Sequence, residues 1–571
     1  MNNETMELLE KHFDIAFAAP DGIKKLRELI LTLAMQGKLV PQDLNDQPAS
    51  ELLKEIEAEK KRLVKEGKMK QPKLLPEIKL EEVPYELPEG WEWVRLGAVS
   101  IYIQRGQGPS YSDIPEIPVI SQKCIQWSGF NKNVVRFIDP CTIDKYRDER
   151  LIRSGDLLWN STGTGTIGRI NLYRDELNEF KKVVADSHVT VVRLTGLCNE
   201  YVLNFLMNPS VQGRIEENAS GTTNQIELNT STVINQIFPL PPLAEQHRIV
   251  AKIDQLMARC DELKKLRAER EQKRITVHTA ALNRLLMAKE SSNFSTAWRF
   301  ITQHFGELYS VKENVTELRK AILQLAVMGK LVPQDPKDEP VENLLARILV
   351  ERKQLKLGSL NESQPPNPLG YDIPEHWKWQ CLNSILVSGP TNGFSPKAVD
   401  YETPVRSLTL SATTSGKFKG EYSKFISNDI PSDSNLWLCD GDILVQRGNT
   451  LEYVGAPAVY RGEPNRFIYP DLMMKLRVSS EIDTNFIYLV MSSEPCRDFL
   501  RSHASGTSGT MPKINQTTLK SLPIPIPPLA EQRRIVVKID RLMTLCDVLK
   551  QRIDDANGKR AALLNALTAQ V

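Results

Sequence analysis

The amino-acid sequence contains two consecutive copies of one pattern, and this duplication limits the possible fold more than any other feature. The segment from residue 23 to 43 (IKKLRELILTLAMQGKLVPQD) returns at 315 to 335 (VTELRKAILQLAVMGKLVPQD), with 13 of 21 positions identical. The segment from 239 to 267 returns at 525 to 553, with 19 of 29 positions identical. Because the two matches lie 292 and 286 positions apart, the 571 residues form two copies of one architecture.

The most similar parts of the two copies have helical patterns. Residues 23 to 34 place their apolar side chains on one stripe, with Asp21 as a plausible N-cap and Gly37 and Pro41 as stop signals. A second amphipathic helix is expected from residue 50 to about 65. After each Pro-Pro pair, apolar residues alternate spacings of four and three, which predicts the heptad seam of a coiled coil. The predicted seam consists of Ile249, Ile253, Leu256, Cys260 and Leu263, and of Ile535, Ile539, Leu542, Cys546, Leu549 and Ile553.

The middle of each copy is less similar and has short apolar runs broken by Gly, Pro, Asn and Ser, which is typical of α/β or α+β domains. We therefore predict an α+β protein with two globular domains separated and bridged by long coiled-coil helices. If the C-terminal helix packs on the N-terminal helices, the duplicated chain acquires pseudo-twofold symmetry. The predicted segments are an N-terminal helical region (1–85), a first domain (86–243), a central helical spacer (244–369), a second domain (370–529) and a C-terminal coiled-coil helix (530–571).

Several classes of protein and site are disfavoured by the sequence. The eight cysteines form no CxxC pair, so neither a zinc site nor a disulfide framework is expected. The chain has no apolar run of membrane-spanning length and begins with a polar, acidic segment, so we expect a cytoplasmic protein without a membrane partner. It also lacks the GxxxxGK[ST] motif of nucleotide hydrolysis. The GxGxxG spacing of Gly163, Gly165 and Gly168 is interpreted as a tight loop, because no helical pattern follows it.

Other recurring residues are assigned to packing. Cys260 and Cys546 occupy the same position of the two seams, which a thiol fills as a small apolar group. The paired tryptophans of PEGWEW (88–93) and PEHWKW (374–379) are interpreted as packing at the entrance of each domain rather than as base-stacking groups. His188 lies in a strand-like run and is interpreted as a structural histidine.

The duplicated motifs together resemble the specificity subunit of type I restriction-modification enzymes. The resemblance rests on PLPPLAEQ and PIPPLAEQ before the heptad helices, on an ASGT loop before each of them, and on PEGWEW and PEHWKW at the start of each domain. The GKLVPQD segments are similar to those of the subgroup with an N-terminal helical extension. The NPPY or DPPY tetrapeptide of amino-methyltransferases is absent from the sequence, which weighs against methyl transfer by this chain.

The resemblance implies a non-catalytic subunit that recognises DNA. Each domain would be a target recognition domain that reads one half of a bipartite, asymmetric site on double-stranded DNA. The helices would set the unread gap and bind two methyltransferase subunits, and two restriction subunits would add ATP-dependent cleavage. No cofactor is expected in this chain, whereas S-adenosylmethionine, ATP and Mg are expected in the partner subunits. A helix of 40 residues is about 60 Å long, which exceeds one DNA turn of about 34 Å.

Candidate DNA-binding residues are polar or basic side chains on loops where the two copies differ, because Arg, Lys, Asn and Gln can select bases through paired hydrogen bonds. The ASGT loops are alike in both copies and suit phosphate contacts better. In the first domain the candidates are Gln104, Arg105, Gln107, Ser110, Tyr111, Asn160, Ser161, Thr162, Arg169, Ser220, Thr222, Thr223 and Asn224. In the second domain they are Thr391, Asn392, Ser395, Lys397, Gln446, Arg447, Asn449, Ser505, Thr507 and Ser508.

Net charge does not identify the partner. Residues 86 to 243 contain 15 Lys and Arg against 18 Asp and Glu, and residues 370 to 529 contain 15 against 16. Since phosphate contacts dominate affinity for DNA, we expect the isolated chain to bind DNA weakly and partner subunits to complete the contact. Two alternatives stay open from the residues alone. One is a duplicated coiled-coil adaptor for proteins without a DNA role, and the other is an enzyme in its own right.

Overall fold

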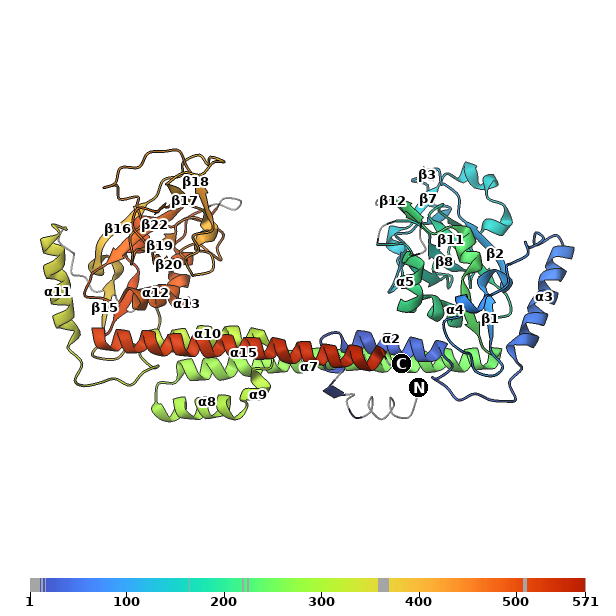
Figure 1. The fold of residues 1–571 in the computed structure, drawn as a ribbon, viewed down its shortest axis with the longest axis horizontal. Coiled ribbons are helices and arrows are strands. Elements are labelled where there is room, and N and C mark those ends of the chain that lie inside the picture. Colours follow the sequence, from blue (N-terminus) through green and yellow to red (C-terminus); the bar gives the residue numbers. More distant parts are fainter. Residues whose placement is uncertain are drawn as a thin grey trace. The chain divides into compact units, whose positions relative to one another are not determined.

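The computed structural model describes residues 11, 14, 15, 17–163, 165–217, 220–222, 225–357, 369–506 and 511–569 (Figure 1). The chain divides into two compact units. Unit 1 consists of residues 1–269 and 556–571, and unit 2 consists of residues 270–555. The two longest helices, α7 (Leu243–Met287) and α15 (Leu529–Ala569), each contribute residues to both units.

The helices of unit 1 pack around the beginning of α7. Helix α2 (Gly22–Met35) buries Ile30, Ala34 and Met35 in the same core as Ile249 and Ile253 of α7. Helix α3 (Ala49–Lys65) buries Leu52 and Ile56 in that core and lies beside the globular part of the unit (Figure 1). The duplicated sequence at each domain entrance is thereby fixed to the helices by a shared apolar core.

The first globular domain, residues 91–240, is closed by pairing of its two ends. Strand β1 (Glu92–Arg95) runs antiparallel to β14 (Ile237–Leu240), with Trp93 opposite Pro239. An antiparallel sheet follows, in the order β2 (Ser100–Arg105), β11 (Val189–Leu194), β8 (Leu157–Asn160) and β9 (Ile170–Leu172). A second sheet has the order β10 (Val184–Ala185), β4 (Pro118–Ile120), β7 (Arg136–Ile138) and β3 (Tyr111–Ser112), in which β10 and β4 are parallel.

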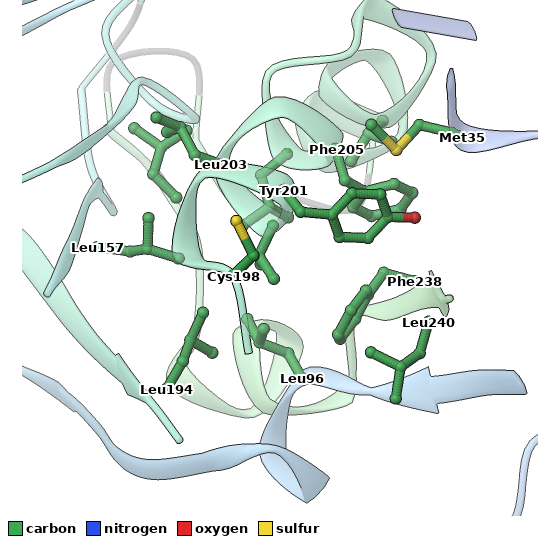
Figure 2. Packing of buried hydrophobic residues seen from close by; sticks show 14 of the residues in the cluster. Met35, Leu96, Leu157, Leu194, Cys198, Tyr201, Leu203, Phe205, Phe238 and Leu240 are labelled. Atoms are coloured by element: carbon green, nitrogen blue, oxygen red, sulfur yellow. The ribbon is translucent and has the colours of Figure 1, made fainter. Parts of the chain in front are cut away.

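Short helices and hairpins complete this domain. They are β5 (Ile125–Gln126) with β6 (Gly129–Phe130), α4 (Asn199–Leu206), α5 (Pro209–Glu217), β12 (Ser220–Thr222) with β13 (Gln225–Glu227), and α6 (Thr230–Asn235). Figure 2 shows Tyr201 and Phe205 of α4 pointing toward Phe238 of β14 and Leu96, so the helix covers the sheet where the two chain ends pair. The Tyr201 hydroxyl donates to the Pro239 carbonyl at 2.8 Å.

Unit 2 repeats these elements. Its helices are α8 (Ser291–Gln303), α9 (Phe305–Leu308), α10 (Lys312–Val327) and α11 (Val341–Gln354). The second globular domain, residues 377–526, is closed by β15 (Lys378–Cys381) with β23 (Pro523–Ile526), where Trp379 lies opposite Pro525. Its main sheet has the order β16 (Leu386–Asn392), β22 (Met473–Val478), β19 (Ile443–Gln446) and β20 (Pro457–Val459). The remaining elements are β18 (Ser423–Phe425), β17 (Arg406–Leu408), β21 (Phe467–Ile468), α12 (Thr484–Ser492), α13 (Glu494–Ser502) and α14 (Gln516–Lys520).

The residues of the predicted heptad seams are buried or half-buried, with one exception. Ile249, Ile253 and Cys260 are buried, whereas Leu263 is 42% exposed. The prediction that Leu263 is buried is therefore wrong, because every residue of α7 from 261 to 270 is exposed among the described residues. The second seam continues to Ile553.

The ends of the two long helices pack in equivalent ways. In unit 1, Leu564 and Leu567 of α15 cluster with Phe17, Ala19 and Leu29. In unit 2, the end of α7 packs on α10 through residues that include Leu282, Leu285, Leu318 and Leu325. The α+β class and the internal duplication are confirmed, whereas the symmetry axis and the five predicted segment boundaries remain predictions.

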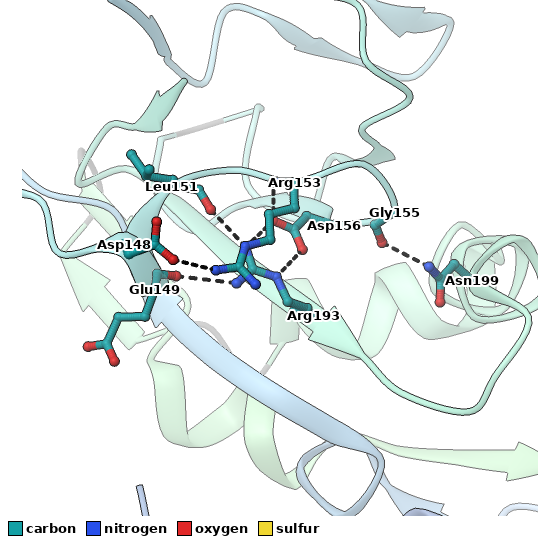
Figure 3. Close-up of polar contacts among 8 residues, drawn as sticks. All are labelled: Asp148, Glu149, Leu151, Arg153, Gly155, Asp156, Arg193 and Asn199. Carbon is teal, nitrogen blue, oxygen red and sulfur yellow. Dashed lines mark hydrogen bonds and ion pairs between the residues drawn. The ribbon is translucent and has the colours of Figure 1, made fainter. Parts of the chain in front are cut away.

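A buried ion pair recurs in the main sheet of each domain. Arg193 of β11 donates to both carboxylate oxygens of Asp156, at 2.7 and 2.6 Å, and Asp156 is completely buried (Figure 3). In the second domain Arg477 of β22, whose side chain is 40% exposed, donates two bonds to Oδ1 of the buried Asp442, at 2.8 and 2.7 Å. The two aspartates occupy corresponding places in the sequences SGDLL (154–158) and DGDIL (440–444), so the ion pair is part of the duplicated pattern. Within the described residues, no helix is long and apolar enough to cross a membrane.

Candidate nucleic-acid interface

Three loops of the first domain meet at one end of its main sheet. Strand β2 ends at Arg105 and β8 ends at Asn160, while β11 begins at Val189. The register places Thr190 opposite Arg105 and Val189 opposite Asn160. The loops 106–111, 161–169 and 186–188 therefore leave the sheet at the same end, and six of the thirteen candidates of the first domain lie on them.

Polar bonds connect these loops. Asp186 accepts from the Tyr111 hydroxyl at 3.0 Å and from the His188 backbone N–H at 3.0 Å. Thr162 Oγ1 and His188 Nδ1 lie 2.7 Å apart. Partial burial, with the Asp186 charge adding to it, raises the pKa of Tyr111, so this phenol stays protonated and keeps donating its hydrogen bond.

A glycine allows the first loop to pass close to the third. A Cβ at Gly106 would lie 2.2 Å from the Ala185 carbonyl oxygen, closer than side-chain atoms approach backbone. Gly393 has the same role in the second domain, where a Cβ would lie 2.0 Å from the Tyr469 carbonyl oxygen. The loop after the first strand is thus held against its neighbour by backbone contact in both domains.

The segment that carries the ASGT motif adjoins the same loops. In the first domain the β12–β13 hairpin continues into Glu227, which forms a bridge with Thr162, and the Leu228 N–H donates to the Ser161 carbonyl at 2.8 Å. In the second domain Ser505 pairs with Lys513, and Lys513 forms a bridge with Gly448. All three predicted sets of residues therefore converge in each domain, which sequence spacing alone did not show.

The loops of the second domain are tied together by different side chains. Ser395 Oγ donates to Asp471, and Arg447 donates to the Asp471 carbonyl at 3.3 Å. The Thr391 and Tyr469 hydroxyls lie 2.9 Å apart. The scaffold is repeated while the loop chemistry differs between the two domains.

Three predicted contact residues are buried and bonded inside the domains. Asn160 Nδ2 donates to the Gln122 carbonyl at 3.1 Å, Ser161 bonds the Thr190 hydroxyl, and Gln446 Nε2 donates to the Leu410 carbonyl at 3.1 Å. None of the three has exposed surface. As placed, these side chains cannot reach a base, because both faces of β8 and β19 are covered and the strands bury even their last residue.

The other candidates differ in exposure. Arg105 is half-buried, donating to the Leu228 carbonyl at 2.8 Å and lying 3.5 Å from the Glu227 carboxylate, and Arg169 donates to Gln126 and to the Gly165 carbonyl. Residues with exposed or half-exposed side chains are Gln104, Gln107, Ser110, Tyr111, Thr162, Thr391, Asn392, Ser395, Lys397, Arg447, Asn449 and Ser505. Thr223, Asn224, Thr507 and Ser508 lie outside the described residues, as do the side chains of Ser220 and Thr222.

A family of DNA-recognition domains matches both copies of this architecture. The family model described as "Type I restriction modification DNA specificity domain" matches residues 88–272 and 378–557. The chain belongs to this family. Each of its two specificity domains comprises one globular domain and the beginning of the long helix that follows it.

Two relatives in this family align with the chain over nearly its whole length and nearly their own. The "Type I restriction enzyme EcoAI specificity subunit" of Escherichia coli is 32% identical over 96% of this chain and 93% of its own length. The EcoEI specificity subunit of Escherichia coli is 31% identical over the same shares. A crystal structure titled as the HsdS subunit from Thermoanaerobacter tengcongensis is 19% identical, covers 86% of this chain and 99% of its own, and has a TM-score of 0.43.

Three residues of the specificity domains lie among the converging loops although sequence reasoning did not select them. Arg136 places its guanidinium carbon 3.3 Å from the centre of the Tyr111 ring, and exposed His188 bonds Thr162. Lys513 pairs with Ser505 in the second domain. Arg136 lies on β7 of the second sheet, beside the strand β3 that begins at Tyr111, and this strand pairing cannot be read from sequence spacing. His188 and Lys513 lie next to the predicted loops because of how the strands pair, and this pairing cannot be read from the sequence.

Proposed function

We propose that this chain is the non-catalytic DNA-recognition subunit of a type I restriction-modification complex, in which each specificity domain reads one half of a bipartite, asymmetric site. The observation that carries the proposal is that loops of three separate segments meet at the end of one sheet, twice, with different exposed side chains. Such loop clusters can present Asn, Gln, Lys and Arg groups to base edges. Because the two domains share a scaffold but carry different loops, they would read half-sites of different sequence.

The helices would set the unread gap and bind the two methyltransferase subunits. Supporting this role, α7 and α15 are continuous helices of 45 and 41 residues, and each contributes to both units. A continuous helix has a fixed rise of about 1.5 Å per residue, so its length can define a separation. Two restriction subunits would join the assembly for ATP-dependent cleavage. S-adenosylmethionine, ATP and Mg would bind in the partner subunits.

The isolated chain would bind DNA weakly. Neither globular domain carries an excess of Lys and Arg, and Arg105 and Arg169 are engaged in bonds within their domain. Because counterion release from phosphates supplies much of the affinity for DNA, few free cations give weak and salt-sensitive binding. Tight, salt-resistant binding by the chain alone would contradict this part of the proposal.

The decisive experiment maps methylated bases across a genome by single-molecule sequencing. The host would express the cognate methyltransferase subunit with and without this chain. We expect a bipartite motif with an unread gap to be methylated only when the chain is present. No difference in methylation, with all subunits expressed and associated, would reject the recognition role.

Replacing residues 371–529 by the corresponding domain of another specificity subunit provides the matched control. Only one half-site should change, and a change of both would contradict independent reading. The near-neutral charge of the domains favours a second candidate function, a protein-binding adaptor. A sequence-specific footprint of the assembled complex on DNA would exclude an adaptor without a DNA role.

A further inference from the structure

A groove of about 1570 Å³ lies in unit 1 between helix α3 and strand β2. One wall is α3 with residues 67–75 that follow it, and the other consists of β2 and the loop 147–153. Of the candidate DNA-binding residues, Gln104 alone among those described lines the groove. The groove is therefore separate from the cluster of converging loops, and the inference from it does not rest on the proposed function.

Helix α3, one wall of the groove, is anchored to the globular domain by a buried cation. The buried ammonium group of Lys60 donates to the carbonyls of Gly97 and Ala98, at 2.9 Å each. Burial lowers the pKa of Lys60, and the two carbonyls compensate for the lost hydration. Arg352 of α11 holds the equivalent position in unit 2, where it donates to the Asn383 and Leu386 carbonyls.

The β2 side of the groove is a free strand edge. In the sheet order β2 is terminal, with β11 as its neighbour. Alternate residues of an antiparallel strand direct their N–H and C=O groups away from the neighbouring strand. On β2, residues Ser100 to Gln104 line the groove. Within the described parts of the chain, no other strand covers this edge. A free edge of this kind can accept an extended peptide as an additional strand.

The side chains around the edge define the chemistry of such a peptide. Half-buried apolar groups line the floor, namely Leu53, Leu63, Val64, Leu75, Ile101, Ile103 and Ile234. Nine Lys and Arg residues line the groove against three acidic ones. Lys65, Lys70, Lys73 and Arg147 are exposed and have no ion pair with any described residue. The groove thus combines an apolar floor with unpaired positive charge.

From this combination we propose that the α3–β2 groove binds an extended acidic peptide of a partner protein, which adds as a strand to β2. In a strand, successive side chains point to opposite faces, so apolar residues can face the floor while Asp or Glu residues face the lysines. A DNA backbone also carries negative charge, but it has no N–H and C=O groups to pair with a strand edge. The strand edge therefore favours a peptide.

The site is specific to the first half of the chain. Residues 61–73 contain five lysines, whereas the corresponding residues 353–365 contain two. One peptide should therefore bind per chain. In this respect the groove differs from partner contacts that would occur in both halves because of the duplication.

The test uses the full chain and a fluorescent, acetylated octapeptide of alternating Glu and Val. We expect saturable fluorescence anisotropy with one peptide per chain. The triple variant Lys65→Glu/Lys70→Glu/Lys73→Glu should weaken binding at least tenfold. The control variant Lys24→Glu/Lys54→Glu/Lys145→Glu changes the charge equally at exposed positions outside the groove and should bind like the unmodified chain.

Two further probes test strand pairing and sign of charge. An octapeptide N-methylated on alternate residues cannot form the strand hydrogen bonds and should bind at least tenfold more weakly. A Lys-Val octapeptide should not bind. The proposal is overturned if the Glu-Val peptide fails to bind, if the N-methylated peptide binds equally well, or if the groove variant retains full affinity. Displacement of the peptide by a DNA duplex, with the same dependence on Lys65, Lys70 and Lys73, would assign the groove to DNA instead.

Discussion

The indole nitrogen of Trp91 donates a hydrogen bond of 3.0 Å to the buried carboxylate of Glu245. Trp377 donates to Glu531 at 3.1 Å in the second unit. These bonds join the first tryptophan of PEGWEW or PEHWKW to the glutamate of the PLAEQ motif that begins each long helix. The two most recognisable duplicated motifs are therefore the two sides of one junction between globular domain and helix.

Replacing Trp91 by Phe should destabilise this junction. Glu245 Oε2 would lose its donor, and its other carboxylate oxygen already has no partner among the described residues. A buried polar group left without its partner costs about 1–3 kcal/mol. Hydrogen exchange measured by mass spectrometry should therefore rise in residues 88–95 and 239–246. The matched variant Trp377→Phe should affect only residues 374–381 and 525–532, and equal effects of both variants on both junctions would contradict the assignment.

The glutamine that follows this glutamate in each PLAEQ motif also makes equivalent bonds in the two units. Gln246 donates to the Pro241 carbonyl at 2.9 Å and accepts from the Cys198 N–H at 3.0 Å. Gln532 makes the same bonds with Pro527 and Asp483. Sequence reasoning found these motifs by their recurrence but could not find their distant partners, because Trp91 is 154 residues from Glu245 and Cys198 is 48 residues from Gln246.

Other features were predictable only in part. Spacing identified the buried Ile249, Ile253 and Cys260, because one face of a helix is covered over that length. The same rule failed at Leu263, which lies in a stretch of α7 where every residue is exposed among the described parts of the chain. Likewise, polar residues at a strand end suggested exposed contact groups, yet Asn160 and Gln446 are buried because tertiary packing covers both faces of their strands.

Unit 2 should lose stability in mildly acidic solution because of His278. This histidine of α7 is completely buried, and its Nε2 lies 3.1 Å from the Tyr309 hydroxyl. Burial lowers its pKa, although the nearby charge of Glu317 opposes that shift. A histidine with a lowered folded-state pKa is protonated first in the unfolded chain, so its contribution to stability is present above pH ~6.5 and is lost below it.

The variant His278→Leu tests this dependence. The equivalent residue of α15 is Leu564, which packs against Phe17 in unit 1, so leucine fits this kind of position. Urea unfolding at pH 7.5 and pH 6.0 should show a smaller pH-dependent loss of stability for the variant than for the original chain. An unchanged difference between the two pH values would exclude His278 as the responsible group.

Substituting Asp156 by Asn should damage the first domain selectively. Arg193 would keep its charge in a buried site without the carboxylate, and breaking a buried ion pair in this way costs about 3–5 kcal/mol. In the assembled complex, methylation should lose its dependence on one half-site while the other half-site is still recognised. Asp442→Asn is the matched control, and it should produce the opposite pattern because Asp442 pairs with Arg477 in the second domain.

Asn392 should contribute to base recognition by the second domain. Its side chain is exposed at the end of β16, next to the close backbone contact at Gly393. Replacing it by Ala should weaken discrimination at one half-site by about 1–3 kcal/mol, the value typical of a good side-chain contact to a base. Gln107→Ala, in the first domain, should affect only the other half-site. Equal loss for all DNA sequences would assign Asn392 to the phosphate backbone.

Lengthening the two long helices should lengthen the unread gap. Residues 261 to 270 of α7 are all exposed, so an insertion between 268 and 270 displaces no buried side chain there and leaves the bond from Arg267 to the Phe17 carbonyl in place. Seven residues, inserted there and in α15 near residue 556, add about 10 Å, or about three base pairs at 3.4 Å each. Because seven residues are nearly two helical turns, the buried faces on either side stay aligned.

Methylation mapping would measure this change directly. Both half-sites should be preserved while the gap between them increases by about three base pairs. Five inserted residues are the control, because they rotate the following helix by about 140° and should abolish assembly or recognition rather than extend the gap. A functional complex with seven added residues and an unchanged gap would show that α7 and α15 do not determine the spacing.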